Sequence, residues 1–265
     1  MVVFRVMTLA LCCLGLAGWA QGSATPVQTV EVMATFAHNT SFFTQGLFFS
    51  DGYLYESTGR YGHSGLFCID LETGVVLREA RYPHVFVEGS AVMGDQIHVL
   101  TWQDGIRIVV RKPDFIPLAA YPLSGEGWGL CTDGHDLWLS NGTNVLYRYR
   151  PLADGRWQEL GRLRVVDAGR PVGLLNELES VNGYLLANVW QTNRIAVIDP
   201  SITNAATGEC PVVLWLDCLD LKAAHPEADV LNGIAWDATA KRLVITGKLW
   251  PLYYQISLPT LLRAQ

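Results

Sequence analysis

The chain has 265 residues, of which 50% are hydrophobic and 17% are charged, and its formal net charge is −6. This composition excludes an intrinsically disordered chain and, because no Lys/Arg-rich run is present, a basic nucleic-acid-binding surface. The length fits one domain with a large core, so a second domain is not required.

The N-terminus, residues 1–20, has the pattern of a cleavable secretory signal. Arg5 precedes an apolar run over 6–16, which small residues follow. The run is shorter than the ~20 residues that span a bilayer, so an uncleaved membrane anchor is the weaker alternative. A lipid anchor on Cys12 is a minor alternative, because the residues before it match a lipobox poorly. We expect a secreted or periplasmic protein whose mature part, residues 21–265, is one domain.

One sequence unit recurs five times along the mature chain. In each unit an apolar run passes through a turn into a second strand, and the first apolar residues of these strands are Leu54, Ile97, Leu137, Leu185 and Leu243. They lie 43, 40, 48 and 58 positions apart, which is typical of propeller blades with four short strands. Asp51-Gly52, Asp133-Gly134 and Asn182-Gly183 predict hairpin turns in three of the units.

Further strands are predicted at 66–70, 106–111, 145–150 and 195–199, which makes the fold class all-β. About 240 mature residues suffice for a five-bladed β-propeller, whereas seven blades would be too short. The ring can close if an early strand at 29–37 completes the last blade beside 252–256. Residues 217–230 break the rhythm and are expected to form a loop with a short helix.

Four cysteines remain once the signal is removed, namely Cys68, Cys131, Cys210 and Cys218. The last two are close enough in the sequence to pair in an oxidising compartment. Four cysteines allow three connectivities, and the sequence does not choose among them. Four buried free thiols are the alternative.

If the five units are equivalent, residues at the same offset lie at the same height around the central channel. Nine positions before the reference residues, after removal of two extra residues in the last turn, lie Gln45, Glu88, Trp128, Asn176 and Asn232. Five positions after them lie Gly59, Trp102, Gly142, Trp190 and Lys248. We refer to these two sets as the first and the second ring.

Ordinary packing between blades favours small or apolar residues in both rings. The amides, indoles, single carboxylate and single ammonium group found there favour a functional pocket over a merely hydrated channel mouth. Apolar walls with a few convergent polar groups are typical of small-ligand sites. We therefore expect one pocket, at one mouth of the channel, that holds a single amino-acid side chain.

Ten motifs in this order resemble those of the plant and bacterial glutaminyl cyclases: FTQGL, YESTGRYGHSGL, FVEGS, LTW, EGWGL, LSNGT, LNELE, ANVW, LNGIAWD and ITGKLWP. They cover most of the mature chain, from Phe43 to Pro251. The resemblance implies a five-bladed propeller that converts the N-terminal glutamine of peptides or proteins into pyroglutamate with release of ammonia. It also implies no catalytic metal and no cofactor. We expect a monomer without stable membrane insertion.

The matching motifs also imply roles for individual residues. The acid of FVEGS, Glu88, corresponds to the family's general acid/base, although Val87 stands where the family usually has glycine. The resemblance assigns the substrate pocket to Gln45, Trp128, Asn176, Trp190 and Lys248 and, with a less complete match, to Trp102. Asn232 is a further pocket candidate because of its place in the first ring.

Two functions of other classes stay open. A propeller that binds an N-terminus without chemistry would not need Glu88. A metal-dependent propeller lactonase or hydrolase would need several Asp, Glu or Asn ligands on the channel axis. Glu88 is the one carboxylate in the two rings, and the six histidines lie at different offsets. Sensitivity of the activity to a metal chelator would identify the metal-dependent class.

Overall fold

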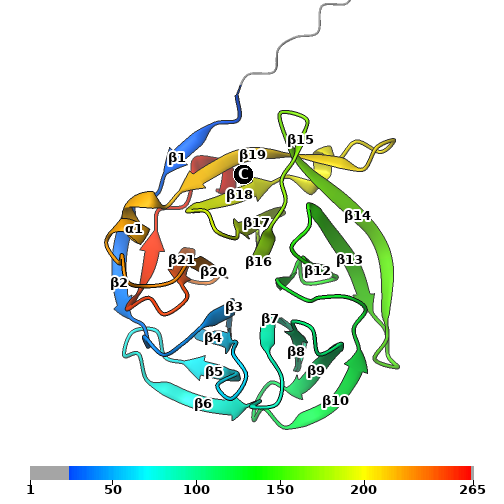
Figure 1. Cartoon of the computed structure of the whole chain (residues 1–265), viewed down its shortest axis with the longest axis vertical. Helices are drawn as coiled ribbons and strands as arrows, with labels where there is room; N and C mark the ends of the chain where they lie inside the picture. The colour runs from blue at the N-terminus through cyan, green and yellow to red at the C-terminus, as the bar shows by residue number, and fades with distance from the viewer. Residues whose placement is uncertain (1–23, 264–265) are drawn as a thin grey trace, which may run out of the picture.

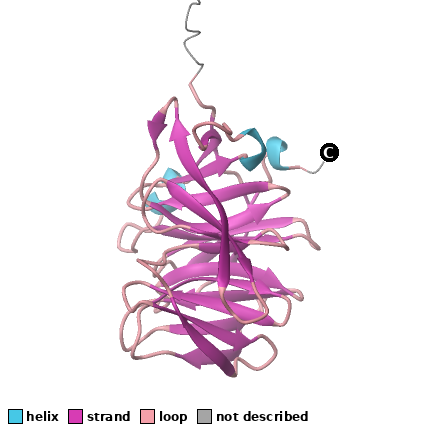
Figure 2. Cartoon of the chain, turned by 90° about the vertical axis from the view of Figure 1, so that its right-hand side faces the viewer, coloured by secondary structure: helices cyan, strands magenta, loops and turns pink. Residues whose placement is uncertain are grey.

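The computed structural model describes residues 24–263, and they are almost entirely β-sheet. The sheets follow one another in chain order around a central axis (Figure 1), and Figure 2 shows this ring from its edge. The prediction of an all-β, propeller-like chain is confirmed. The predicted signal peptide lies outside the described residues and stays a prediction.

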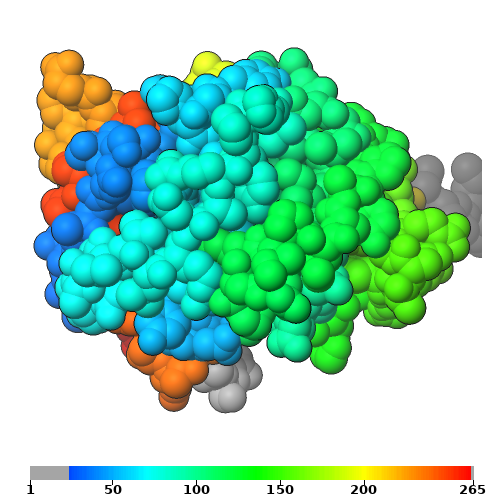
Figure 3. Space-filling view, turned by 90° about the horizontal axis from the view of Figure 1, so that it is seen from below, coloured from blue at the N-terminus to red at the C-terminus, as the bar shows by residue number. Residues whose placement is uncertain are grey.

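Three sheets have four antiparallel strands each. The first contains β3 (Thr44–Ser50), β4 (Tyr53–Thr58), β5 (Gly65–Ile69) and β6 (Val76–Arg81). The second contains β7 (Val87–Met93), β8 (Gln96–Thr101), β9 (Ile106–Arg111) and β10 (Pro117–Pro122). The third contains β20 (Leu231–Asp237), β21 (Arg242–Gly247), β22 (Leu252–Ile256) and β2 (Val32–Ala37). Viewed from below, the first two of these sheets lie side by side (Figure 3).

The remaining strands form one sheet of ten strands. One antiparallel run contains β11 (Leu130–Thr132), β12 (Leu137–Leu139), β13 (Val145–Pro151) and β14 (Trp157–Asp167). The other contains β16 (Leu175–Val181), β17 (Tyr184–Val189), β18 (Arg194–Ile198) and β19 (Glu209–Asp217). Their outer strands β14 and β19 pair in parallel, and β1 (Val27–Thr29) and β15 (Arg170–Pro171) add to the edges.

The predicted hairpins are present in all five units, and each reference residue lies in the second strand of its hairpin. At the β3–β4 turn both Asp51 and Gly52 have positive φ, 52° and 81°, as the tight turns favoured between twisted strands require. The Asp133-Gly134 turn differs, because four residues connect β11 to β12. There the Asp133 carboxylate accepts a hydrogen bond from the Asp136 backbone N–H at 2.8 Å, which stabilises the longer loop.

The N-terminal strand closes the ring as predicted. β2 pairs with β22, with Ala37 opposite Leu252 and Val32 opposite Ile256. The expected continuous strand at 29–37 is in fact two strands, because β1 turns away to pair with β19. The expected short helix is α1 (Leu219–Ala223), and single 3-10 turns lie at Pro200–Ile202 and Thr260–Leu262.

Burial decreases from the axis to the rim of the ring. The inner strands β3 and β7 begin with five consecutive buried residues, whereas the outer strands β6 and β10 alternate between exposed and partly buried ones. The core lies between neighbouring sheets: Phe48 and Leu66 of the first sheet, for example, pack with Val99 of the second. Since the inner strands are covered on both faces, polar side chains near the axis must find partners there.

The four cysteines are buried and free, so neither the Cys210–Cys218 bridge nor any other pairing of them is present. Cys210 Sγ instead donates to the backbone oxygen of Asp199 at 3.2 Å. No helix in residues 24–263 is long and apolar enough to cross a membrane.

Candidate active site

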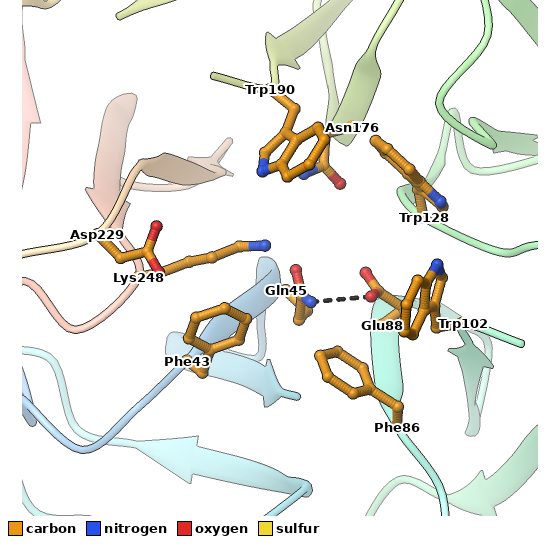
Figure 4. Close-up of a pocket in the computed structure, with 10 residues that line it drawn as sticks. All are labelled: Phe43, Gln45, Phe86, Glu88, Trp102, Trp128, Asn176, Trp190, Asp229 and Lys248. Atoms are coloured by element: carbon orange, nitrogen blue, oxygen red, sulfur yellow. Dashed lines mark hydrogen bonds between the residues drawn. The ribbon is translucent and has the colours of Figure 1, made fainter. Parts of the chain in front are cut away.

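A pocket of about 310 Å³ opens where the inner strands begin (Figure 4). It is lined by aromatic rings and a few polar groups: Phe43, Gln45, Phe86, Glu88, Trp102, Trp128, Asn176, Trp190, Asp229 and Lys248. The structure thus brings seven of the eight predicted site residues together in one pocket. The eighth, Asn232, is fully buried and does not line it.

β-Bulges aim the first-ring side chains. The strand register shifts between Thr44 and Gly46 and between Val87 and Ser90, and similar shifts occur at the starts of β16 and β20. Gln45, Glu88, Asn176 and Asn232 lie inside these four irregularities. A bulge inserts one residue into a strand and redirects its side chain, which is why bulges are frequent beside active sites.

Small residues bring the inner strands close together beside the pocket. A Cβ added to Gly129 would lie 2.0 Å from the backbone oxygen of Asn176, and one added to Gly89 would lie 2.6 Å from the Leu130 nitrogen. The Gly89 N–H donates to the Trp128 backbone oxygen at 2.7 Å. Gly89 and Gly129, which directly follow Glu88 and Trp128, therefore fix the spacing between pocket side chains that come from neighbouring sheets.

A chain of amides orients the carboxylate of Glu88. Asn232 Nδ2 donates to the Thr44 backbone oxygen at 2.9 Å and to Gln45 Oε1 at 3.4 Å. With its oxygen held in this way, Gln45 turns Nε2 toward Glu88 Oε1 at 2.8 Å. Asn232 thus acts on the pocket from behind, through Gln45. The Glu88 backbone is also held, because Ser57 Oγ donates to its oxygen at 2.7 Å.

Burial controls the charge of Glu88. The side chain is almost completely enclosed, and desolvation raises the pKa of its carboxyl well above the ordinary value. The Lys248 ammonium lowers this pKa and the Glu126 carboxylate raises it, both more weakly than burial does. A carboxyl in this environment holds its proton to higher pH than an exposed glutamate does and can exchange that proton with a substrate.

Lys248 approaches the centre of the pocket from the side opposite Trp102 (Figure 4). Burial lowers the pKa of its ammonium, while Glu88 and Asp229 raise it. Its Nζ lies 4.6 Å from the centre of the Phe43 ring, which also carries the Arg60 guanidinium at 4.2 Å. None of the ion pairs within residues 24–263 joins Lys248 to Glu88, so the ammonium is available to a bound ligand.

Glu126 fixes two of the tryptophan walls. Its Oε2 accepts hydrogen bonds from Trp102 Nε1 at 2.9 Å and from Trp128 Nε1 at 2.8 Å, and its Oε1 accepts one from Gln103 at 2.7 Å. With both indole N–H groups turned to Glu126, these rings present their flat surfaces to the pocket. Trp190 stands edge-on to Trp128, with ring centres 5.6 Å apart.

The second ring contributes space as well as side chains. A Cβ at Gly59 would lie 2.4 Å from the Phe86 ring, and one at Gly142, which has φ +80°, would lie 2.7 Å from the Trp128 ring. Glycine in these places leaves room for pocket aromatics from the neighbouring strand. Val87, which departs from the family motif, is buried in the core between the first and second sheets.

The sequence analysis missed four residues of this region. Phe43, Phe86 and Glu126 share one offset, two residues before Gln45, Glu88 and Trp128. Side chains two residues apart point the same way in extended chain, so extending the first ring by one step would have found them. Asp229 lies in an irregular loop and shares no such offset. Among the described residues, no group of three His, Cys, Asp or Glu side chains could hold a metal ion.

Comparisons with known proteins agree on one family. The profile of the glutamine cyclotransferase family matches residues 5–258. A glutaminyl-peptide cyclotransferase of Arabidopsis thaliana is 37% identical over 259 residues, which is 91% of this chain and 76% of that protein. The crystal structure of the Myxococcus xanthus glutaminyl cyclase superposes with a TM-score of 0.78 at 35% identity, over 88% of this chain and 97% of that one. A β-propeller domain of Cps50 (Swd1) from Myceliophteria thermophila, at 10% identity, shares only the fold, with a TM-score of 0.51 over 87% of this chain and all of that one.

Proposed function

The chain belongs to the glutamine cyclotransferase family, and we propose that Glu88 is the general acid and base with which it acts. It is a glutaminyl-peptide cyclotransferase, which converts the N-terminal glutamine of a peptide into pyroglutamate and releases ammonia. The observation that carries the proposal for Glu88 is a buried carboxyl with a raised pKa in a pocket walled by aromatic rings.

The reaction moves one proton between two nitrogens of the same residue. The α-amine attacks the carbon of the side-chain amide, a bond from nitrogen to that carbon forms, and the bond to the amide nitrogen breaks. The α-nitrogen loses a proton and the departing nitrogen gains one, so that it leaves as ammonia. In the proposed cycle Glu88 donates its proton to the departing nitrogen and recovers one from the α-nitrogen, which returns the carboxyl to its starting state.

The rest of the pocket holds the substrate in the reactive shape. An extended glutamine side chain must curl until its amide carbon meets the α-amine, and a close-fitting pocket lowers the entropic cost of that conformation. The indole rings of Trp102, Trp128 and Trp190 enclose the curled side chain. Negative charge develops on the amide oxygen during attack, and the Lys248 ammonium and the Asn176 amide are the groups proposed to stabilise it.

We also propose that the sheets form five propeller blades. The two antiparallel four-strand runs of the large sheet, β11 to β14 and β16 to β19, each correspond to one of the separate four-stranded sheets. In this proposal the parallel pairing of β14 with β19 joins two neighbouring blades at their rims. Residues 21–265 then form a single domain.

Substrate discrimination tests the proposed function. A peptide that begins with glutamine is expected to release ammonia, whereas the same peptide with glutamate is expected to react at least about 100-fold more slowly near neutral pH. An ionised carboxylate is a poor electrophile, so the α-amine attacks it far more slowly than it attacks the amide. The measurement is pyroglutamyl-peptide formation followed by mass spectrometry. Similar rates for the two peptides would contradict the proposed pocket chemistry.

The dependence of the rate on pH gives a second prediction. Two variants are expected to shift the alkaline limb of the profile in opposite directions. Because the proposed cycle starts from protonated Glu88, the rate should fall as pH rises through the raised pKa of Glu88. Lys248→Met removes a cation that lowers this pKa, so the alkaline limb should move to higher pH. Glu126→Gln removes an anion that raises it, so the limb should move to lower pH.

Both variants are compared with the wild type in kcat against pH. The position of the limb, rather than its height, reports the pKa, so a general loss of rate does not obscure the result. Shifts of both variants in the same direction would exclude Glu88 as the group that titrates.

A further inference from the structure

A second cavity, of about 570 Å³, lies outside the active pocket, between the second sheet and strands β12 to β14. It is larger than the pocket, and no step of the proposed reaction uses it. Its walls include Arg107, Leu123, Glu126, Tyr147, Tyr149 and Trp157. We call this cavity the side groove.

Glu126 connects the side groove to the active pocket. It lines the groove, and its carboxylate holds the indole N–H groups of Trp102 and Trp128, which line the pocket. The two cavities therefore lie on the two sides of one glutamate and its two indoles. Hydrogen bonds to Gln103, Trp128 and Trp102 lower the pKa of Glu126, so its carboxylate is ionised at neutral pH.

Aromatic rings form one wall of the side groove. Tyr147 and Tyr149 are nearly parallel, with an interplanar angle of 12° and ring centres 6.3 Å apart. Trp157 continues the wall, with its ring centre 5.5 Å from that of Tyr149. All three rings are partly exposed. A wall of this kind is suited to an aromatic side chain, which gains from stacking and edge contacts in addition to burial.

The groove also carries a cation that no carboxylate neutralises. Two of its arginines are paired, Arg156 with Asp154 at 2.7 Å and Arg162 with Glu159 at 2.6 Å. Arg107 is 2% exposed and takes part in none of the ion pairs of residues 24–263.

The surroundings of Arg107 hold its guanidinium without cancelling the charge. It lies 4.3 Å from the centres of both the Tyr121 and the Trp157 rings, and it donates to the backbone oxygen of Gly155 and to His98 Nδ1, the latter at 3.4 Å. Burial lowers its pKa to about 10, so it remains a cation at neutral pH. A buried cation without a carboxylate partner favours an anionic group in the space beside it.

We propose that the side groove binds the part of the substrate that follows the N-terminal glutamine, and that it prefers an aromatic side chain followed by an acidic one. This inference rests on the proposed function. Cyclisation uses the α-amine and the side-chain amide of the glutamine, so the rest of the peptide leaves the pocket from the α-carbonyl. Ionised Glu126, next to the pocket, disfavours an acid directly after the glutamine. The aromatic wall and Arg107 then suit the aromatic residue and the acid that follow.

The test compares two peptide amides, Gln-Phe-Asp-Gly and Gln-Gly-Gly-Gly. The wild type is expected to prefer the first by about ten-fold in kcat/KM, mainly through KM, because stacking and charge pairing add binding without touching the reacting atoms. In the double variant Tyr147→Ala/Tyr149→Ala this preference is expected to fall at least about three-fold, because the aromatic contacts are lost while Arg107 remains. Tyr53→Ala, which removes a tyrosine 42% exposed outside both cavities, serves as the matched control and should keep the preference.

A binding measurement separates the groove from the chemistry. Calorimetric titration with the cyclised peptide, pyroglutamyl-Phe-Asp-Gly-amide, needs no turnover and should show weaker binding to the double variant than to the control. If the wild type cyclises both peptides equally well, or if both variants bind the cyclised peptide alike, the groove proposal is overturned. If the wild type cyclises neither peptide, the proposed function fails, and the titration alone then decides the groove.

Discussion

Replacement of Glu88 by glutamine is expected to reduce the rate of pyroglutamyl-peptide formation by at least about 100-fold, the usual effect of removing a general acid/base. Glutamine has nearly the same shape as glutamate, and its amide oxygen can still accept the hydrogen bond that Gln45 Nε2 donates at 2.8 Å. The pocket should therefore keep its geometry. What the variant loses is the proton that moves between the two nitrogens of the substrate.

The experiment measures kcat and KM with one glutamine-initiated peptide, and thermal unfolding is the folding control. Glu79→Gln is the matched variant, because Glu79 pairs with Arg81 on the exposed rim and its side chain is 50% exposed. It should behave as the wild type. A folded Glu88→Gln enzyme with more than about a tenth of the wild-type rate would remove Glu88 from the proposed role.

The sequence predicted most of the pocket because the repeat converts position in the chain into position in space. Once the five units were aligned, Gln45 and Glu88 were predicted to lie at the same height around the channel. The same alignment predicted one common height for the residues of the second ring. The sequence could not show which first-ring side chains reach the cavity. That depends on local bulges, which turn Gln45 into the pocket and leave Asn232 behind it.

Features that depend on contacts between distant backbones were not predictable either. The parallel pairing of β14 with β19 depends on backbone hydrogen bonds between two outer strands, and these leave no pattern in side-chain type or spacing. The loop that brings Asp229 into the pocket belongs to no repeat. Glu177 and Glu179 are buried carboxyls of β16 with raised pKa values. The sequence pattern of this segment predicted an inner strand and did not indicate these two buried acids.

Removal of the Glu56 carboxylate is expected to lower the stability of the fold more than removal of an exposed carboxylate does. The side chain is completely buried in β4 of the first sheet. It accepts hydrogen bonds from Thr44 Oγ1 at 2.7 Å and from Tyr253 Oη at 2.5 Å, and His38 Nε2 lies 3.2 Å away. Tyr253 belongs to β22 and His38 directly follows β2. The network therefore joins the first sheet to the sheet that contains both the first and the last strands of the ring.

Glu56→Ala leaves the hydroxyls of Thr44 and Tyr253 buried without this partner. Breaking a buried polar network in this way should lower the free energy of unfolding by about 3 kcal/mol or more. For a domain of this size that corresponds to a fall in Tm of roughly 10 °C. Glu56→Gln keeps an acceptor oxygen for Thr44 and allows Tyr253 to accept from the new amide, so it should cost much less.

The comparison that isolates burial is Glu72→Ala. Glu72 also joins the first and third sheets, through an ion pair with Arg242 at 2.6 Å, but its side chain is 65% exposed. An exposed ion pair contributes at most about 1 kcal/mol, so Tm should change little. The measurement is thermal and urea unfolding of the three variants beside the wild type. If Glu56→Ala and Glu72→Ala had equal effects, closure of the ring would depend on backbone pairing of β2 with β22, and the buried network would add nothing to it.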